Sequence, residues 1–209
     1  MFQHELLYRG PDAAARIQST RIVIGGCGAL GANIAILLWR AGIRSADLID
    51  NQRIDAQNIG TQPWESRDIG SRKTDALAVI LHRIAGHGDI RTYCKDMEHV
   101  RGIGAAPKQI AVALDCFDNA AARGAFILNV SLPMIHVGMG NGIAEVKWEG
   151  RYTIPTDAEV VDGVCEYPLA NTLVATTAAL AAEAVLRYVS GSERMNADLT
   201  FNDMRIVLS

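Results

Sequence analysis

A glycine-rich turn near the start of the chain constrains the fold more than any other feature. It has the sequence Gly26-Cys27-Gly28-Ala29-Leu30-Gly31 and joins an apolar run, Arg21–Gly25, to a helical pattern at Ala29–Ala41. This spacing permits a tight turn, a close approach of a phosphate group to the backbone, and a helix N-terminus that attracts anions. We therefore predict a strand–turn–helix unit that binds a nucleotide through Gly26, Gly28 and Gly31.

The rest of the first two thirds of the chain alternates short apolar runs with helical patterns. Such alternation requires crossover connections, which produce a mostly parallel sheet covered on both faces. We predict a doubly wound, Rossmann-like α/β fold. The expected strands are Arg21–Gly25, Ala46–Asp50, Ile90–Cys94, Ile110–Asp115 and Pro133–Val137, and the expected helices are Ala29–Ala41, Lys73–Ala85 and Asn119–Asn129.

The pattern changes after residue 137 and indicates a C-terminal antiparallel extension. We expect a hairpin around Glu149-Gly150, a surface loop, a long helix and a final strand. The chain has no internal repeat and no flexible linker, so we expect one domain, with a nucleotide-binding core at residues 1–137 and the extension at 138–209. The hairpin strands are Ile143–Trp148 and Arg151–Ile154, the loop is Pro155–Pro168, the helix is Leu169–Val189, and the strand is Leu199–Leu208.

Composition excludes several functional classes. The chain has 209 residues, 49% of them apolar, and a net charge of −3, so bulk charge gives no reason to expect a nucleic-acid or membrane partner. Residues 1–10 contain no signal-peptide pattern, and the apolar segment 169–189 carries charged residues, so we expect a buried helix in a cytoplasmic protein. The four cysteines form no Cys-x-x-Cys pair, and we expect neither zinc nor disulfides.

Three charged residues extend the nucleotide hypothesis. Asp50 ends the second expected strand about twenty residues after the turn, where a carboxylate accepts hydrogen bonds from ribose hydroxyls, although it could instead cap the loop that follows. Lys73 is a cation suited to a triphosphate, or a solvated helix residue. Asp118 is an oxygen ligand suited to Mg²⁺, or the N-cap of the next helix. Up to Asp50, an NAD-dependent oxidoreductase would fit equally well.

Three further segments occur in a fixed order: Asp50–Ile59 with Gln62, Asp68-Ile69-Gly70-Ser71-Arg72-Lys73, and Asp115-Cys116-Phe117-Asp118-Asn119 continued to Arg123. Taken together, they resemble the ThiF/MoeB/HesA family, the bacterial relatives of ubiquitin-activating enzymes. The resemblance implies ATP and Mg²⁺ as cofactors, and adenylation of the C-terminal glycine carboxylate of a small ubiquitin-like or sulfur-carrier protein by a homodimer. It also implies that the three glycines cradle the nucleotide, that Asp50 holds the ribose, that Asn58 and Lys73 contact phosphates, and that Asp118 binds Mg²⁺.

The sequence departs from the family pattern at two phosphate-binding arginines. Thr61 and His4 occupy their positions. Because arginines at such sites can contribute several powers of ten to phosphoryl chemistry, their loss favours an alternative hypothesis, a nucleotide-binding scaffold or partner subunit that lacks catalysis. An NAD-dependent oxidoreductase is a third hypothesis. Candidates to replace the two arginines are Arg9, Arg16, Arg67 and Arg72.

Three other positions have two interpretations each. Cys165 lies where some relatives carry a thioester or persulfide cysteine, although its acidic neighbours favour an inert thiol. His136 falls at the end of an expected strand, where open sheets bind ligands, but we expect a core histidine. The segment Met139-Gly140-Asn141-Gly142 is either a turn or a place where the tail of a partner protein approaches.

Overall fold

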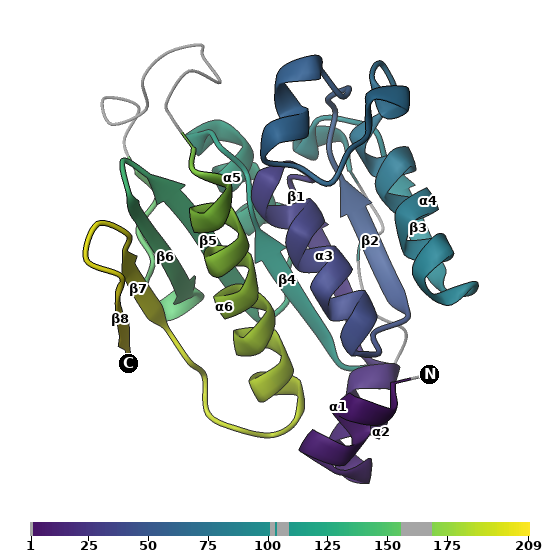
Figure 1. Ribbon diagram of the computed structural model, residues 1–209, viewed down its shortest axis with the longest axis vertical. Coiled ribbons are helices and arrows are strands. Elements are labelled where there is room, and N and C mark those ends of the chain that lie inside the picture. The colour runs from purple at the N-terminus through teal and green to yellow at the C-terminus, as the bar shows by residue number, and fades with distance from the viewer. Residues whose placement is uncertain (1, 101–102, 104–108, 156–168) are drawn as a thin grey trace.

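The computed structural model describes residues 2–100, 103, 109–155 and 169–209. Its eight strands form one sheet in the order β3-β2-β1-β4-β5-β6-β7-β8, and Figure 1 shows this sheet behind a layer of helices. The first five strands are mutually parallel, which confirms the predicted doubly wound α/β fold. They are β1 (Arg21–Gly25), β2 (Ser45–Ile49), β3 (Asp89–Tyr93), β4 (Ala111–Asp115) and β5 (Met134–Gly140).

Helices cover both faces of the parallel part. On one face lie α3 (Ala29–Ala41) and α4 (Lys73–Ala85), while α5 (Ala120–Asn129) lies on the other (Figure 1). Every residue of β1 and β4 is buried, which explains why these central strands, apart from the terminal Arg21 and Asp115, are continuously apolar rather than alternating. The bounds of α3 and α4 are those predicted.

The antiparallel extension is present, but its hairpin differs from the prediction. Strand β6 (Ile143–Trp148) pairs with β5 rather than with residues 151–154, which form no strand. The turn lies at Asn141-Gly142, where both residues have positive φ angles of 51° and 76°. Such a turn matches the natural twist of a hairpin, and asparagine–glycine is its favoured sequence. Of the segment Met139–Gly142, the first two residues therefore end β5 and Asn141-Gly142 form the turn, and Glu149–Arg151 forms a 3₁₀ helix, η4.

The predicted final strand is in fact two. Strand β7 (Ala197–Thr200) and strand β8 (Arg205–Leu208) are antiparallel neighbours. Residues 201–204 turn the chain between them, with Met204 at φ 52°. The prediction of one continuous strand was wrong because apolar residues lie on both sides of this turn, and only the polar pair Asn202-Asp203 marks it.

Three helices complete the fold. Helix α6 (Asn171–Val189) packs against α3 and β6, and α1 (Gln3–Arg9) and α2 (Pro11–Ser19) lie at the lower end of the sheet in Figure 1. By length and composition α6 could cross a membrane, but here it buries its apolar side on the sheet, as predicted for residues 169–189. The chain therefore uses its most apolar helix to cover the junction of parallel and antiparallel strands.

Candidate functional site

The predicted site residues gather at one edge of the sheet. Gly26, Asp50 and Asp118 follow the C-terminal ends of β1, β2 and β4, which are neighbouring parallel strands. In open α/β sheets ligands bind at this edge, where the strand order reverses, and here the order reverses between β1 and β4. The fold itself therefore brings together residues that are up to 92 positions apart in the sequence (26 to 118).

Two glycines of the turn are required by packing, and the third faces open space. A Cβ on Gly26 would lie 2.7 Å from the carbonyl oxygen of Cys116, and one on Gly31 would lie 1.9 Å from the carbonyl oxygen of Gly26. At Gly28 the nearest atom to an added Cβ is Gln62 Nε2, 3.9 Å away. Gly28 is the N-cap of α3 and no side chain caps this helix, so its first N–H groups remain available to an anion.

Asp50 holds the glycine turn in place. Its Oδ2 accepts a hydrogen bond of 2.8 Å from the backbone N–H of Cys27, and its Oδ1 accepts one of 2.7 Å from that of Gln52. Burial raises the pKa of the Asp50 carboxyl, and Lys73 and the two N–H donors oppose this rise. Asp50 therefore does cap the following loop, and each oxygen keeps a second lone pair that a ribose hydroxyl could use.

Lys73 is a buried cation at the start of α4. Its side chain is 5% exposed, and Nζ donates a hydrogen bond of 2.6 Å to Oε1 of Gln52. The interpretation of Lys73 as a solvated surface residue is therefore wrong. Because its bonded partner is a neutral amide, the ammonium charge is not cancelled by a directly bonded carboxylate.

Asn58 is also buried, in the 3₁₀ helix η1 (Ala56–Gly60). Its Oδ1 accepts a hydrogen bond of 2.9 Å from the backbone N–H of Asp55, and the Asp55 side chain accepts one from the backbone of Asn58 in return. This reciprocal capping fixes the orientation of the amide. Within the described part of the chain, no group accepts a hydrogen bond from Nδ2 of Asn58, so this group can donate to a ligand oxygen.

Asp118 is exposed and does not cap α5. The N-cap is Asn119, whose Oδ1 accepts a hydrogen bond of 2.8 Å from the backbone N–H of Ala122. Among the described residues, no group of three or more His, Cys, Asp or Glu side chains could hold a metal ion. A lone exposed carboxylate nevertheless fits Mg²⁺, which typically takes one or two carboxylates and completes its shell with phosphate oxygens and water. The roles of these residues toward a nucleotide and Mg²⁺ stay predictions.

Comparison with protein families identifies the family of this chain. The model of the ThiF family matches residues 3–206. The chain belongs to the ThiF family. The resemblance inferred from segments 50–62, 68–73 and 115–123 is thereby confirmed.

Two curated relatives show how this ThiF-family chain relates to longer proteins. "Adenylyltransferase and sulfurtransferase MOCS3" of Drosophila persimilis is 26% identical over 161 residues, which cover 77% of this chain and 35% of the relative. "Adenylyltransferase and sulfurtransferase uba4" of Aspergillus terreus is 32% identical over 117 residues, which cover 54% of this chain and 24% of the relative. The chain thus spans about a third or less of the length of these relatives.

Solved structures share the fold of this ThiF-family chain. MccB of E. coli, crystallised with ATP, superposes with a TM-score of 0.78 at 18% identity, covering 100% of this chain and 70% of MccB. PaaA superposes with a TM-score of 0.69 at 15% identity, covering 95% of this chain and 66% of PaaA. At this identity the likeness concerns the fold alone.

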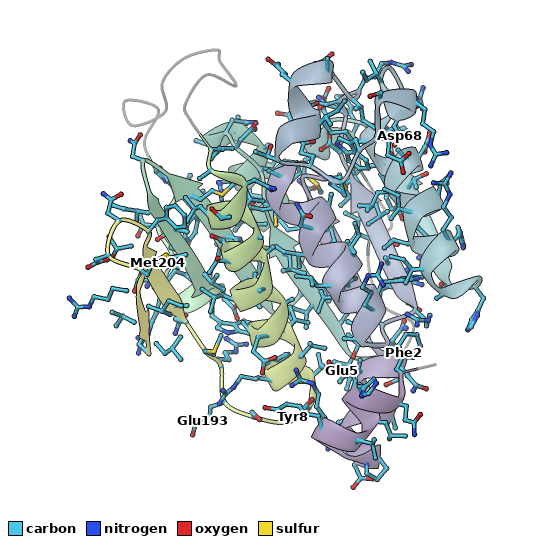
Figure 2. The ribbon with its side chains drawn as sticks, in the orientation of Figure 1. Phe2, Glu5, Tyr8, Asp68, Glu193 and Met204 are labelled. Atoms are coloured by element: carbon cyan, nitrogen blue, oxygen red, sulfur yellow. The ribbon has the colours of Figure 1, made fainter. Side chains whose placement is uncertain are left out.

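Two of the four arginines proposed to replace those of the ThiF family lie at the wrong end of the molecule. Arg9 bonds to Glu183 at 2.6 Å and to Glu5 at 2.7 Å. Figure 2 shows Glu5 and Tyr8, which belong to the same helix, at the end opposite Asp68. Arg16 lies beside Gly191, after the C-terminus of α6. Neither can reach the site of its own chain.

The other two arginines lie closer but are directed elsewhere. Arg67 pairs with Glu65 at 2.9 Å. Arg72 forms an antiparallel bridge with Arg53 and is exposed, whereas the next residue, Lys73, is buried. Because successive side chains of an extended segment point to opposite sides, Arg72 points away from Lys73. Thr61, at the family's arginine position, caps η1 and accepts a hydrogen bond of 3.2 Å from Nδ2 of Asn33 through its carbonyl oxygen.

A buried charged cluster beside the site was not predicted from the sequence. Asp115 Oδ2 accepts hydrogen bonds from Arg123 Nη1 at 3.0 Å and from His136 Nδ1 at 2.8 Å. The His136 ring stacks on Tyr152, with ring centres 4.0 Å apart, and burial raises the pKa of the Tyr152 hydroxyl. His136 is therefore a bonded core histidine, as expected. A signal was present, since Asp115 and Arg123 both belong to the family segment.

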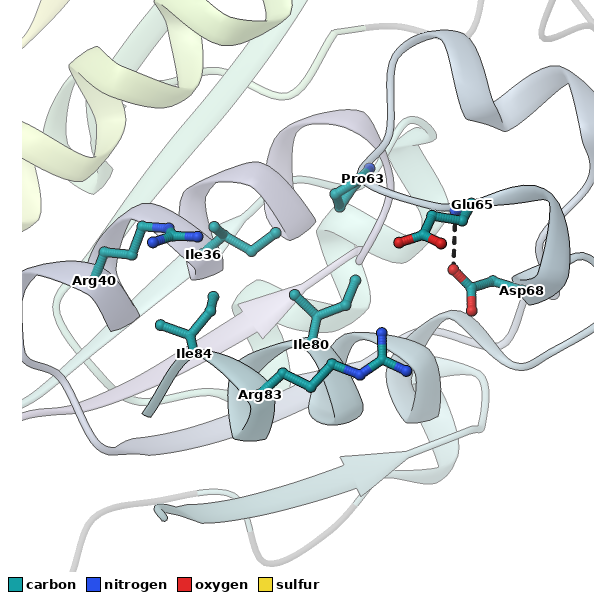
Figure 3. A pocket seen from close by; sticks show the side chains of 8 residues that line it. All are labelled: Ile36, Arg40, Pro63, Glu65, Asp68, Ile80, Arg83 and Ile84. Atoms are coloured by element: carbon teal, nitrogen blue, oxygen red, sulfur yellow. Dashed lines mark hydrogen bonds between the residues drawn. The ribbon is translucent and has the colours of Figure 1, made fainter. Parts of the chain in front are cut away.

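A separate groove lies on the outer surface between α3 and α4, with a volume of about 460 Å³. Figure 3 shows isoleucine side chains along it, with Arg40 on α3, Arg83 on α4, and Glu65 and Asp68 at one end. None of the predicted nucleotide-site residues lines it. Cys165, the candidate thiol acceptor, lies outside the described residues.

Proposed function

We propose that this chain is an ATP-dependent adenylyltransferase that activates the C-terminal glycine carboxylate of a small ubiquitin-like or sulfur-carrier protein. The observation that carries the proposal is the buried ammonium group of Lys73, hydrogen-bonded to a neutral amide, beside Asp50 and the open glycine turn. Two kinds of relative support it. MOCS3 and uba4 are named adenylyltransferases, and MccB was crystallised with ATP and with AMPCPP and MccA.

The proposed reaction needs phosphate charge to be offset rather than a dedicated general base. The carboxylate oxygen of the carrier forms a bond to the α-phosphorus of ATP, and the bond from that phosphorus to the oxygen shared with the β-phosphate breaks, releasing pyrophosphate. Free N–H groups of α3, Nδ2 of Asn58 and Nζ of Lys73 are suited to bind the phosphate oxygens, and Asp50 to orient the ribose. Asp118 would hold Mg²⁺, which offsets phosphate charge when bound.

We also infer a cytoplasmic homodimer. Within the described residues, none of the four candidate arginines is directed toward the site of its own chain, so a second copy is the natural source of a further cation. Sedimentation equilibrium at micromolar concentration tests this, and a monomer under all conditions would contradict it.

A catalytically impaired scaffold is the second candidate. Thr61 at an arginine position, without a replacement from the four candidate arginines, is the observation that favours it. A scaffold would bind ATP but would not exchange pyrophosphate into it.

Calorimetry with Mg·ATP and with NAD is the decisive first experiment. We expect wild type to bind Mg·ATP in preference to NAD, and Lys73→Ala to lose most of this affinity. Lys147→Ala, which removes a lysine paired with Asp198 on the antiparallel side of the sheet, is the matched control and should bind normally. If NAD binds instead, the oxidoreductase hypothesis replaces both candidates. ATP–pyrophosphate exchange with a carrier that ends in Gly-Gly then separates enzyme from scaffold.

A further inference from the structure

Gln52 connects the two charged residues of the candidate site through three hydrogen bonds. Its backbone N–H donates to Oδ1 of Asp50 at 2.7 Å, and its carbonyl oxygen accepts from the backbone N–H of Lys73 at 3.1 Å. Its side-chain Oε1 accepts from Nζ of Lys73 at 2.6 Å. Gln52 is thus bonded to both residues, and through the side chain it fixes where the ammonium group lies.

The backbone around Gln52 makes this contact rigid. The neighbouring pair Arg53 and Arg72 forms an antiparallel bridge, reinforced by a hydrogen bond of 2.9 Å from the N–H of Ile54 to the carbonyl of Ser71. In such a bridge the side chains of Gln52 and Lys73 lie on the same side, opposite those of Arg53 and Arg72. The position of Lys73 is therefore fixed by this antiparallel bridge as well as by the start of α4.

The side-chain group that accepts the hydrogen bond from Lys73 is a neutral amide, and this affects the charge of the site. Gln52 is exposed, so burial does not forbid a carboxylate at this position. A glutamate would reach the same Nζ and would form an ion pair with it. An amide oxygen orients the ammonium group without adding a second carboxylate to that of Asp50, which already attracts this charge. The ammonium group therefore keeps more of its charge for an incoming anion than it would beside a glutamate.

We propose that Gln52 is a positioning residue for triphosphate binding, which orients Lys73 while keeping its charge available. This inference rests on the proposed function, because it concerns the same site. It predicts that the charge of residue 52 affects ligands according to their phosphate content.

The test compares ATP with adenosine, which has the ribose and base but no phosphate. We measure both affinities by calorimetry for wild type, Gln52→Glu and Gln52→Leu. The control is Gln18→Glu, the same charge change at an exposed position of α2, at the other end of the sheet. Thermal unfolding of each variant checks that the fold is intact.

We expect Gln52→Glu to weaken ATP binding by about tenfold, the scale of one charge-assisted hydrogen bond, with adenosine affinity changed by less than about twofold. Gln52→Leu keeps the Lys73 charge but removes its anchor, so ATP affinity should fall by about threefold. Gln18→Glu should match wild type. This selective loss of ATP affinity is a change that a merely structural role for Gln52 would not produce.

Two outcomes overturn the proposal while leaving the proposed function intact. One is an equal loss of ATP and adenosine affinity in Gln52→Glu, which would mean that the variant deforms the pocket. The other is unchanged ATP affinity in both variants. A wild-type chain that binds neither ligand would instead refute the proposed function, and the positioning role with it.

Discussion

His136 Nδ1 lies 2.8 Å from Oδ2 of Asp115, and Nη1 of Arg123 reaches the same oxygen at 3.0 Å. The other oxygen of Asp115 accepts a hydrogen bond of 3.2 Å from the backbone N–H of Phe117. Phe117 immediately precedes Asp118, so the cluster also fixes the turn that presents the proposed Mg²⁺ ligand. The buried carboxylate therefore serves both stability and the geometry of the site.

Replacing Asp115 should destabilise the protein strongly. Asp115→Asn removes the negative charge opposite a buried guanidinium, and we expect the free energy of unfolding to fall by about 3 kcal/mol. Urea unfolding measures this. The control is Asp198→Asn at the exposed Lys147–Asp198 pair, which should cost less than about 1 kcal/mol. Equal effects of the two substitutions would contradict the argument.

Stability should decline at alkaline pH because of Cys27. Burial raises the pKa of this thiol well above its ordinary value of 9.0. The folded state keeps the thiol proton, while the unfolded state loses it as pH rises past 9.0. The stability that the protonated Cys27 thiol contributes is therefore fully present below pH 9.0 and is lost above it. Unfolding free energy should therefore fall with pH by up to about 1.4 kcal/mol per unit more in wild type than in Cys27→Ala.

Urea unfolding at a series of pH values from 8 to 10.5 tests this difference. Cys94→Ala is the matched control, since Cys94 is partly exposed and bonds to Thr74. It should keep the wild-type slope. If the unfolding free energy depends on pH equally in wild type and in Cys27→Ala, ionisation of the Cys27 thiol is not coupled to folding.

Asp118 should govern the magnesium dependence of nucleotide binding. In Asp118→Asn we expect ATP affinity with Mg²⁺ to fall by about tenfold, because a carboxylate ligand is lost. With EDTA the same variant should bind ATP as well as wild type or slightly better, because a negative charge near the phosphates is gone. Asp203→Asn, in the β7–β8 turn, should change neither. An equal loss with and without Mg²⁺ would contradict a role in metal binding.

The sequence predicted the parallel core well because its signals are local. The glycine turn, the apolar strands and Lys73 at the start of α4 each follow from neighbouring residues, and the structure reproduces the bounds of β1, α3 and α4. The hairpin was misplaced because two glycine-containing pairs, Asn141-Gly142 and Glu149-Gly150, compete for the turn. The twist of the strands, which favours positive φ at both turn positions, decides between them.

Contacts between distant segments could not be predicted in this way. The link from Gln52 to Lys73 depends on an antiparallel bridge between residues 19 positions apart (53 and 72). The convergence of Arg123 and His136 on Asp115 depends on the pairing of β4 with β5 and on the position of α5. Likewise, only the fold shows that Arg9 lies at the opposite end from the site.

Restoring the arginine that the family pattern has at Thr61 should strengthen triphosphate binding. Thr61 is half-buried and directly follows η1, the 3₁₀ helix that contains Asn58, and its carbonyl oxygen accepts a hydrogen bond from Asn33. Thr61→Arg adds a cation at this position. Helix η1 contains no carboxylate that would compete for it, and the side chain of its N-cap, Asp55, already accepts a hydrogen bond from the backbone of Asn58. We expect Mg·ATP affinity to rise by about tenfold and adenosine affinity to stay within about twofold.

Thr61→Gln is the matched control, because it adds length without charge and should leave the ratio of ATP to adenosine affinity near that of wild type. Unfolding by urea should be similar for all three proteins. If Thr61→Arg also raises the rate of ATP–pyrophosphate exchange, the chain is an adenylyltransferase whose turnover is limited by the missing cation. If affinity rises without exchange, the scaffold hypothesis gains support, since nucleotide binding would then be separable from catalysis. An unchanged ATP affinity would mean that position 61 does not face the phosphates, which would contradict the family alignment of Asn58–Gln62.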